Sequence, residues 1–291
     1  MDDYKLKIHN SFSSKVESYD AYAKIQKVVA ERMIERLDVM NFTPKNILDL
    51  GCGTGLLTSL LNKRYNDSRI ISVDFSSEML KTCFEKDVKS SFVCADIEYL
   101  PFKSMNFDLV ISNFTLHWCQ NLQKILLDVQ NNLTDQGIFF FSTLGPDSLN
   151  ELREAFLEVD RFNHVNNFID MHHYGDMLND VNFVDPVMDV ENITLKFNSF
   201  FDAVNSIRKI GANVLLDTST KPLSKIEVNT LISSFPKSSD NKYPLTYEVI
   251  YGTAWAKKTM SHDDSKVCLL YTSPSPRDQR GYGLGASAVQ K

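Results

Sequence analysis

The chain has 291 residues, of which 43% are hydrophobic and 23% charged, and its formal net charge is −6. This composition is typical of a globular protein, and the acidic balance argues against general nucleic-acid binding. No apolar run approaches the roughly 20 residues that cross a bilayer, and the initial MDDYKLKIHN lacks the apolar core of a signal peptide.

The first predicted element is an amphipathic helix over residues 21–37, with Ile25, Val29 and Met33 on one face. Strands and helices then alternate. The strand candidates are residues 46–50, 69–74, 91–95, 107–112 and 137–143, and helical patterns follow Gly55, Ser76, Asn121 and Asp147. This alternation predicts an α/β fold in which a parallel sheet has helices on both faces and binds ligands at the carboxyl ends of its strands.

The second half predicts extended segments at residues 184–197 and 245–256, with helical stretches at 200–210 and 224–234 between them. Another helix begins near the pair His172-His173, for which we do not expect metal binding. A helical pair between two late strands would lie beside the ligand crevice, where it could form a lid or a substrate wall. We therefore expect an N-terminal helical lid segment (1–40), a cofactor-binding core (41–197), a helical insertion (198–243) and a last sheet strand (244–257).

The remaining residues, 258–291, differ in character from the rest of the chain. They include VCLLYTSPSPRDQRGYGLGASAVQK, which is rich in Ser, Pro and Gly and has no periodicity. This text resembles translated cloning sequence, so we expect a disordered, non-native tail. The five cysteines include no C-x-x-C pair, which favours reduced thiols in the cytoplasm and argues against a metal site.

A glycine-rich turn, DLGCGTG at residues 49–55, joins the first strand of the alternating region to the helix behind it. Glycines at such a turn let the backbone bend tightly and approach a ligand. The spacing is not the G-x-G-x-x-G of dinucleotide-binding proteins. In addition, an acidic residue, Asp49, lies just before the first glycine of the turn. An acid is unfavourable beside a pyrophosphate but suits S-adenosylmethionine (SAM), which carries an ammonium and a sulfonium group and no phosphate.

Further acids end the next two strands. Asp74 lies about 20 residues beyond the glycines, the offset at which an acid binds ribose hydroxyls, and Met79 can pack on adenine. Asp96, with Ile97 beside it, can accept a hydrogen bond from the adenine amino group. The other expected cofactor contacts are Gly51, Cys52, Gly53, Phe75, Asn113 and Phe114.

Each of these features alone has an ordinary explanation, since three glycines can simply form a turn and an Asp at a strand end can cap a helix. Together they resemble the class I SAM-dependent methyltransferases. The resemblance implies SAM as cofactor and a Rossmann-like fold with a mostly parallel seven-stranded sheet, an N-terminal helix and a helical lid insertion.

Longer stretches are more specific. They are FSSKVESYDAYAKIQ (12–26), NFTLHW (113–118), STLGPDSLNELR (142–153), HVNNFIDMHHYGDML (164–178) and YPLTYEVIYGTAW (243–255). They resemble the malonyl-acyl-carrier-protein O-methyltransferases of biotin synthesis, the BioC-type family, over about residues 10–257. The resemblance implies methylation of the free carboxylate of malonyl-acyl carrier protein, with malonyl-coenzyme A left open as a substrate, in a cytoplasmic enzyme that we expect to be a monomer without membrane or nucleic-acid partners.

The resemblance also implies roles for individual residues. Arg153 is expected to bind the malonyl carboxylate, because a planar guanidinium matches a carboxylate; a solvated arginine on a helix face is the alternative. Tyr19 is expected to close over the cofactor near the reactive methyl group, or else to be an apolar plug. His117 and Trp118 follow the fourth strand and are expected to line the pocket, although His117 can equally be a packed, neutral histidine.

A carboxylate is already ionised at pH 7, since carboxyl pKa values lie near 4 in unfolded peptides, so no general base is required. We expect catalysis to come from alignment and from closure of a dry site. Because acyl carrier protein is acidic, its docking surface should be basic, unless the charges are only a solvated face. The candidates are Lys24, Lys27, Arg32, Arg36, Arg208 and Lys209.

Three other interpretations remain open at this point. The chain could methylate another small molecule, such as a quinone precursor. It could be an assembly factor of a respiratory complex that modifies an arginine of a partner. It could also bind SAM without catalysis, because acids that bind a cofactor do not prove turnover.

Overall fold

The computed structural model describes residues 3–86, 88–102, 107–215 and 222–256, and all of them lie in one compact unit, Met1–Lys258. The tail expected from residue 258 therefore falls outside the described residues. Within them, no helix is both long enough and apolar enough to cross a membrane.

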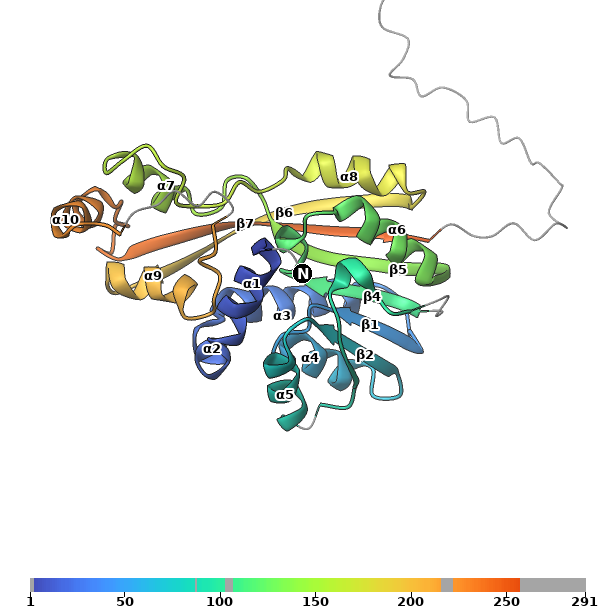
Figure 1. Ribbon diagram of the computed structural model, residues 1–291. Helices are drawn as coiled ribbons and strands as arrows, with labels where there is room; N and C mark the ends of the chain where they lie inside the picture. Colours follow the sequence, from blue (N-terminus) through green and yellow to red (C-terminus); the bar gives the residue numbers. More distant parts are fainter. Residues whose placement is uncertain (1–2, 87, 103–106, 216–221, 257–291) are drawn as a thin grey trace, which may run out of the picture. The chain divides into compact units, whose positions relative to one another are not determined.

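A seven-stranded sheet forms the centre of this unit (Figure 1). Its strands are β1 (Asn46–Leu50), β2 (Arg69–Asp74), β3 (Ser91–Cys94), β4 (Phe107–Asn113), β5 (Leu133–Leu144), β6 (Val184–Phe197) and β7 (Tyr243–Trp255). They lie in the order β3-β2-β1-β4-β5-β7-β6. Neighbours from β3 to β5 pair in parallel, and β7 runs antiparallel to both β5 and β6. The mostly parallel seven-stranded sheet predicted from the sequence is confirmed.

Helices cover both faces of the sheet. They are α1 (Asp3–Ser13), α2 (Val16–Tyr22), α3 (Lys24–Val39), α4 (Leu56–Arg64), α5 (Ser77–Glu85), α6 (Leu122–Asn132), α7 (Asn150–Leu157), α8 (Met171–Asp180), α9 (Phe200–Arg208) and α10 (Lys225–Ser234). Apolar side chains of α3, α4, α7, α9 and α10 belong to one core cluster, and those of α6 and α8 belong to another.

The strands supply side chains to both clusters because successive residues of a strand point to opposite faces. In β5, Ile138 and Phe140 join the first cluster, whereas Phe139 and Phe141 join the second. A strand that is covered on both sides is therefore apolar where it is covered, as the middle of β5, residues 138–141, is.

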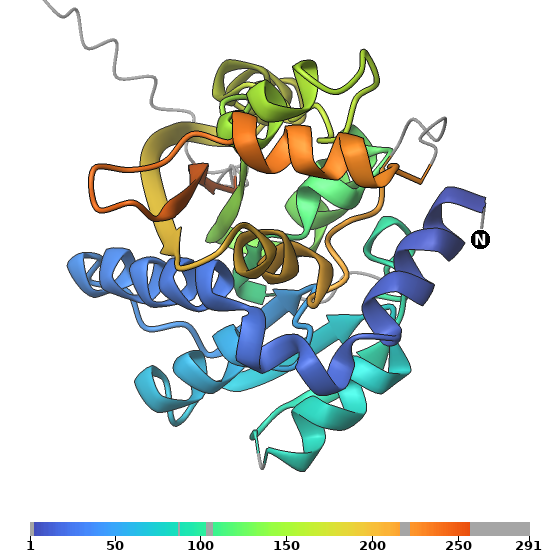
Figure 2. The same ribbon diagram turned by 90° about the vertical axis from the view of Figure 1, so that its left-hand side faces the viewer.

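The N-terminal region differs from the prediction of a single helix over residues 21–37. Helix α3 covers most of that range, but α1 and α2 precede it. Helix α1 buries only Lys5 and Ile8, so its sequence carries little apolar periodicity, and a helix of this length depends on packing against the rest of the fold. Figure 2 shows these N-terminal helices, in dark blue, beside the golden helix α9.

The contact between the N-terminal helices and α9 is close and polar. Ser11 donates a hydrogen bond to the carbonyl of Gly211 at 2.9 Å, and Ser18 donates one to the carbonyl of Lys209 at 2.7 Å. Gly211 has a φ of +82°, and a Cβ there would lie 2.8 Å from the backbone oxygen of Ser11. The expected insertion between β6 and β7 thus contains two helices, α9 and α10, and the first of them contacts the N-terminal segment.

Candidate functional site

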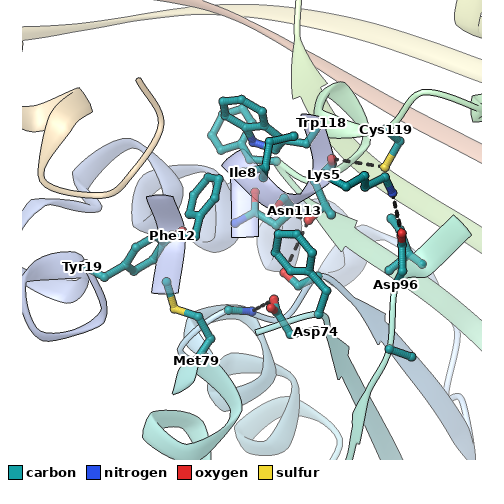
Figure 3. Close-up of a pocket in the computed structure, with 17 residues that line it drawn as sticks. Lys5, Ile8, Phe12, Tyr19, Asp74, Met79, Asp96, Asn113, Trp118 and Cys119 are labelled. Atoms are coloured by element: carbon teal, nitrogen blue, oxygen red, sulfur yellow. Dashed lines mark hydrogen bonds and ion pairs between the residues drawn. The ribbon is translucent and has the colours of Figure 1, made fainter. Parts of the chain in front are cut away.

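A pocket lies at the carboxyl ends of the central strands, with helix α1 along one side (Figure 3). It brings together residues from distant parts of the chain. The predicted site residues that line it are Tyr19, Gly51, Gly53, Asp74, Phe75, Met79, Asp96, Ile97, Asn113, Phe114 and Trp118. We call this space the cofactor pocket.

A smaller pocket adjoins it and shares Tyr19, Gly51, Gly53 and Asn113 with it. The two remaining predicted cofactor residues, Asp49 and Cys52, line this smaller pocket. Every residue predicted from the glycine loop and the strand ends is therefore found in these two adjoining pockets, which follows from the parallel order of β1, β2 and β4.

The glycines of the loop are needed for different reasons. Gly51 has a φ of +72°, and a Cβ there would overlap the side chain of Thr115. Gly53 has a φ of +53° and faces open space, since the nearest heavy atom to a Cβ there would be the Tyr19 hydroxyl oxygen, 4.0 Å away. Gly51 thus permits packing within the protein, whereas Gly53 exposes backbone to the pocket.

Two buried carboxylates support this loop. Asp74 accepts hydrogen bonds from the backbone N–H groups of Gly53 and Ser76, both at 2.9 Å, and burial raises its pKa to about 6. Asp49 accepts a hydrogen bond from the Thr58 hydroxyl at 2.6 Å, and burial raises its pKa to about 7. Both charges are poorly solvated, so hydrogen-bond donors or a cation from a ligand would stabilise them.

Gln26 is a pocket residue that the sequence analysis missed. It lines the smaller pocket with Asp49, and its Oε1 is buried without a hydrogen-bond partner among the described residues. Gln26 lies in register with Ala30, Met33 and Leu37 on the buried side of α3. A polar residue on the apolar face of a predicted helix is the sequence feature that could have identified Gln26.

The side chain of Asn113, which was expected to contact the cofactor, already forms hydrogen bonds within the protein. Its side-chain amide donates to the backbone carbonyl of Gln26 at 3.0 Å and accepts from the Ser142 hydroxyl at 2.7 Å. The amide therefore fixes α3 to β4 and β5 and is held in place by both contacts.

The expected adenine end contains a further unpredicted residue. The ammonium group of Lys5 lies 2.7 and 2.8 Å from the two carboxylate oxygens of Asp96 (Figure 3). It also lies 2.8 Å from a carboxylate oxygen of Glu98. Helix α1 also contributes Ile8 and Phe12 to the pocket wall. These residues could not be found by motif, because the chain brings them to the site only through tertiary packing.

The chemistry of the pocket fits SAM. An acceptor without a partner and the carboxylate of Asp49 lie where a cationic amino group could be bound, and Asp74 offers acceptors for hydroxyl groups. The apolar side chains of Met79, Ile97 and Ile8 provide walls for a flat base. A pyrophosphate, by contrast, would lie against the buried carboxylates of Asp49 and Asp74, and Lys86 beside the glycine loop is already bound to the Thr54 carbonyl and to Asp20.

Tyr19 and Trp118 lie where the prediction placed them, at the pocket. Tyr19 lines both adjoining pockets, and burial together with the nearby Asp74 raises its pKa, so that its phenol is neutral. The rings of Trp118 and Phe12 are in edge-to-face contact, with 5.4 Å between the ring centroids. Together these aromatic groups form an apolar boundary on the side of the pocket where α1 and α2 lie.

His117 lines none of the cavities described here. Its ring contacts those of Phe114, Trp118 and Phe168, and burial lowers its pKa to about 3. The imidazole is therefore neutral at pH 7. This placement fits the packed, neutral histidine that was one of the two interpretations.

A larger cavity of about 320 Å³ lies beyond Trp118, which lines both this cavity and the cofactor pocket. We call it the second cavity. Its walls come from α7, α9, α10 and the segment before α8, and most of them are apolar. The polar side chains among its lining residues include Asn166, Asn205 and Arg208.

Arg153 is placed differently from the expected direct contact with substrate. Its guanidinium donates to the backbone carbonyls of Val165, at 3.2 Å, and Asn166, and it does not line the cofactor pocket or the second cavity. Burial lowers its pKa, and its Nε is buried without a hydrogen-bond partner within the described ranges. The contact with malonate stays a prediction.

Two of the candidate docking residues are engaged within the protein. Arg32 binds Glu35 at 2.8 Å, and Arg36 binds Asp189 at 2.7 Å while its guanidinium lies 3.7 Å from the ring centre of Tyr251. The contacts of Arg36 attach α3 to the strands β6 and β7, and a docking role for Arg32 and Arg36 stays a prediction. Arg208 and Lys209 are exposed at the end of α9.

The pair His172-His173 lies at the exposed start of α8, where His172 binds Asp170 at 2.6 Å. In the part of the chain that the structure describes, no group of three or more His, Cys, Asp or Glu side chains could hold a metal ion. His172 contacts Asp170, the residue that caps the start of this helix.

Comparison with known proteins gives consistent results. The family model described as a methyltransferase domain matches residues 48–141. The malonyl-[acyl-carrier protein] O-methyltransferases of Gallionella capsiferriformans and Methylovorus sp. are 37% and 38% identical over 262 and 265 residues, which is 86% of this chain in both cases and 90% and 88% of theirs. The enzyme of that name from Laribacter hongkongensis is 33% identical over 94% of this chain and 97% of its own.

Solved structures show the same fold at low identity. The YcgJ protein of Bacillus subtilis is 16% identical and superposes with a TM-score of 0.56 over 78% of this chain and 98% of its own. A putative methyltransferase from Bacillus halodurans is 14% identical, with a TM-score of 0.57 over 79% and 99%. At these identities the likeness concerns the fold alone.

Proposed function

The chain belongs to the malonyl-[acyl-carrier protein] O-methyltransferases, and we propose that it methylates the free carboxylate of malonyl-acyl carrier protein with SAM as methyl donor. The product would be the malonyl methyl ester that starts pimeloyl and biotin synthesis. The observation that carries this proposal is the identity of 37% over nearly the whole length of a relative with that name, together with a cofactor pocket of matching chemistry.

The second cavity supports an acyl substrate with a long arm. It is mostly apolar, and Trp118 is common to it and to the cofactor pocket. A thioester arm in the second cavity would bring a terminal carboxylate to Trp118, at the border of the two spaces. SAM, when bound, supplies a methyl group on a positively charged sulfur.

The residues at that border keep the site dry and uncharged. The Phe12 and Trp118 rings are in edge-to-face contact, the phenol of Tyr19 is neutral, and His117 is neutral because burial lowers its pKa to about 3. A malonyl carboxylate needs no general base, and charges of opposite sign that disappear during transfer react more readily where water is excluded. We therefore assign Tyr19 and Trp118 to orienting the reactants rather than to proton transfer.

In this proposal Arg153 acts on the wall of the second cavity. It holds the carbonyls of Val165 and Asn166, and both of those residues line the second cavity. A shift of this segment would free the guanidinium for the malonyl carboxylate. Without such a shift, Arg153 shapes the cavity wall, and in both cases its loss should reduce turnover while cofactor affinity stays nearly unchanged.

The carrier protein would dock beside the second cavity. Arg208 lines that cavity and Lys209 follows it, and both are exposed, so they could meet an acidic partner. A monomeric state and a cytoplasmic location stay predictions from the sequence.

The test is methyl transfer from labelled SAM to malonyl-acyl carrier protein, with acetyl-acyl carrier protein as the control because it lacks the free carboxylate. Transfer to the first and none to the second is expected. A folded preparation that binds SAM but does not methylate malonyl-acyl carrier protein would contradict the proposal. Transfer to malonyl-coenzyme A in the same assay decides whether the carrier protein is required.

A charge reversal tests the docking part separately. Arg208→Glu should raise the KM for malonyl-acyl carrier protein about tenfold, the equivalent of about 1.4 kcal/mol, and leave the KM for SAM unchanged. Lys63→Glu is the matched control, because Lys63 is exposed on α4 and lines neither the cofactor pocket nor the second cavity. Equal effects of both reversals would place the carrier protein elsewhere.

A further inference from the structure

Lys5 is a buried lysine at the expected adenine end of the cofactor pocket. It is only 6% exposed, and its ammonium group lies within 2.8 Å of carboxylate oxygens of both Asp96 and Glu98. Burial alone would lower the pKa of Lys5, but the hydrogen bonds to the two acids outweigh it and the pKa is raised. The lysine is therefore a cation held between two anions, and it comes from a helix that is remote in sequence from both.

Helix α1 narrows the pocket. It contributes Lys5, Ile8 and Phe12 to the wall, and the cavity that remains measures about 90 Å³, whereas small-molecule sites usually measure about 300–1,000 Å³. Since a nucleoside with an amino acid attached needs a site of the usual size, α1 in this position restricts the space that is left for the cofactor. Movement of α1 is the simplest way to open the pocket, because the other walls belong to the sheet and its loops.

The N-terminal segment, residues 3–22, makes polar contacts with the walls of the cofactor pocket along its length. At the glycine loop, Asp20 accepts from the Thr54 hydroxyl at 2.6 Å and binds Lys86 at 2.5 Å. In the middle, the hydroxyl groups of Ser13 and Ser76 lie 2.8 Å apart. At the far end, Lys5 forms ion pairs with Asp96 and Glu98, and these lie at the expected position of adenine.

We propose that Lys5 is a positioning residue that holds α1 over the adenine end of the cofactor pocket, so that SAM and its demethylated product S-adenosylhomocysteine enter and leave only when the Lys5 ion pairs open. The proposal rests on the SAM site and not on the identity of the methyl acceptor. Asp96 Oδ2 accepts a hydrogen bond from Lys5, and because a carboxylate oxygen has two lone pairs, the second can accept from the adenine amino group when α1 is closed.

Removal of the cation should favour the open position. Without Lys5, Asp96 and Glu98 would be two neighbouring carboxylates with no positive charge between them under α1, and each would gain solvation if the helix moved away. Opening would then become easier both before the cofactor binds and after. The two rate constants, association and dissociation, should therefore rise together.

The experiment measures S-adenosylhomocysteine binding to the full chain by stopped-flow fluorescence, with Trp118 at the pocket as reporter. For Lys5→Met we expect both rate constants to rise at least fivefold, so that the dissociation constant changes less than either rate. Lys5→Arg keeps the charge and should restore most of the parent rates. Lys7→Met is the matched control on the same helix, because Lys7 is half exposed and binds only Asp3 in the same helix, and it should leave both rates unchanged.

Two results would overturn the proposal. One is parent rates in Lys5→Met. The other is a faster dissociation with unchanged association, which would show that Lys5 acts only on bound cofactor through Asp96. If Lys5→Met does not fold, Glu98→Gln carries the test, because it removes one of the two anions and should raise both rates by a smaller factor; parent rates there would equally contradict the proposal. Failure of the chain to bind S-adenosylhomocysteine at all would instead contradict the cofactor assignment.

Discussion

At the level of single residues, the cofactor pocket is made of polar groups that the fold has removed from water. Gln26 Oε1 is buried without a partner in the described part of the chain, and the carboxylates of Asp49 and Asp74 are almost completely buried. Such groups cost stability in the empty protein unless a ligand supplies hydrogen bonds or charge. Their presence in one place is therefore a better sign of a binding site than the glycines beside them.

Gln26→Leu should weaken SAM binding about tenfold, because a hydrogen bond to a charged group contributes about 1.5–3 kcal/mol. Calorimetry with SAM and with 5′-methylthioadenosine measures this effect. The second ligand lacks the amino-acid part and should bind the variant and the parent equally. An equal loss for both ligands would show that Gln26 supports the pocket as a whole and does not bind the ammonium group.

The pKa values of Asp49 and Asp74 predict a pH dependence with opposite signs for stability and for binding. Both are raised by burial from 3.8, to about 7 and about 6. Between pH 3.8 and about 7 the folded empty chain therefore binds more protons than the unfolded chain, and these two groups make it less stable as the pH rises. A cofactor that donates hydrogen bonds or brings a cation favours the ionised carboxylates, so its affinity should be highest above pH 7 and fall as the pH is lowered.

Calorimetric titration with S-adenosylhomocysteine from pH 8 to pH 5 checks this dependence. We expect a loss of affinity on the order of tenfold between pH 8 and pH 6. In Asp49→Asn the step near pH 7 should disappear, while the step near pH 6 that belongs to Asp74 remains. A constant affinity over the whole range would mean that neither carboxylate meets the cofactor.

At the level of elements, the contact of α1 and α2 with the residues that follow α9 connects two segments that are about 200 residues apart in the sequence. Ser11 and Ser18 donate to backbone carbonyls of Gly211 and Lys209. Since α1 lines the cofactor pocket and α9 lines the second cavity, we expect a movement of one helix to affect the other. This contact offers a physical route by which cofactor binding could order the acyl site.

Gly211→Ala tests that contact. A side chain at φ +82° is strained, and its Cβ would lie within 2.9 Å of backbone atoms of Ser11 and Phe12; the left-handed conformation alone costs a residue other than glycine about 1–2 kcal/mol. We expect faster hydrogen exchange in α1 and lower methyl transfer. Gly175→Ala is the control, because a Cβ there would meet its nearest neighbour at an ordinary 3.8 Å inside helix α8. Similar exchange of α1 in both variants would show that the two helices are not coupled.

The elements also differ in how far the sequence predicts them. Strands β1 and β2 and the long β6 begin and end where the apolar pattern places them, because burial on fixed faces leaves a periodic record in the sequence. Helix α1 leaves no such record. Its stability comes from Lys5, Ser13 and Phe12 meeting groups of the core, and these contacts obey no local period.

At the level of the whole molecule, the cofactor should stabilise the folded chain. Ligand at 100 times its dissociation constant contributes about 2.7 kcal/mol, which raises the Tm of a domain of this size by about 5–10 °C. Thermal unfolding with S-adenosylhomocysteine, compared with NAD and ATP at equal concentration, measures this shift. A larger shift with either phosphorylated nucleotide would contradict the argument that acids at the strand ends select a cationic cofactor.

The sequence by itself determines the α/β class, the glycine loop and the acids that end the first three strands. It can do so because each of these features depends on a few neighbouring residues: a turn needs glycine at positive φ, and parallel strands place their carboxyl ends together. From Asp49, Asp74 and Asp96 alone the position and charge of the cofactor pocket were predictable. The longer motifs add the family, and with it the methyl acceptor.

Only the tertiary structure decides what closes the pocket and what is free to react. Lys5 and Gln26 reach the site from N-terminal helices, Arg36 is occupied by Asp189, and Arg153 is bound to backbone carbonyls. Each of these placements depends on which groups lie within about 3 Å of the side chain. Those groups come from other parts of the chain that the fold brings close. Residue type specifies what a group can bind, whereas packing specifies what it does bind.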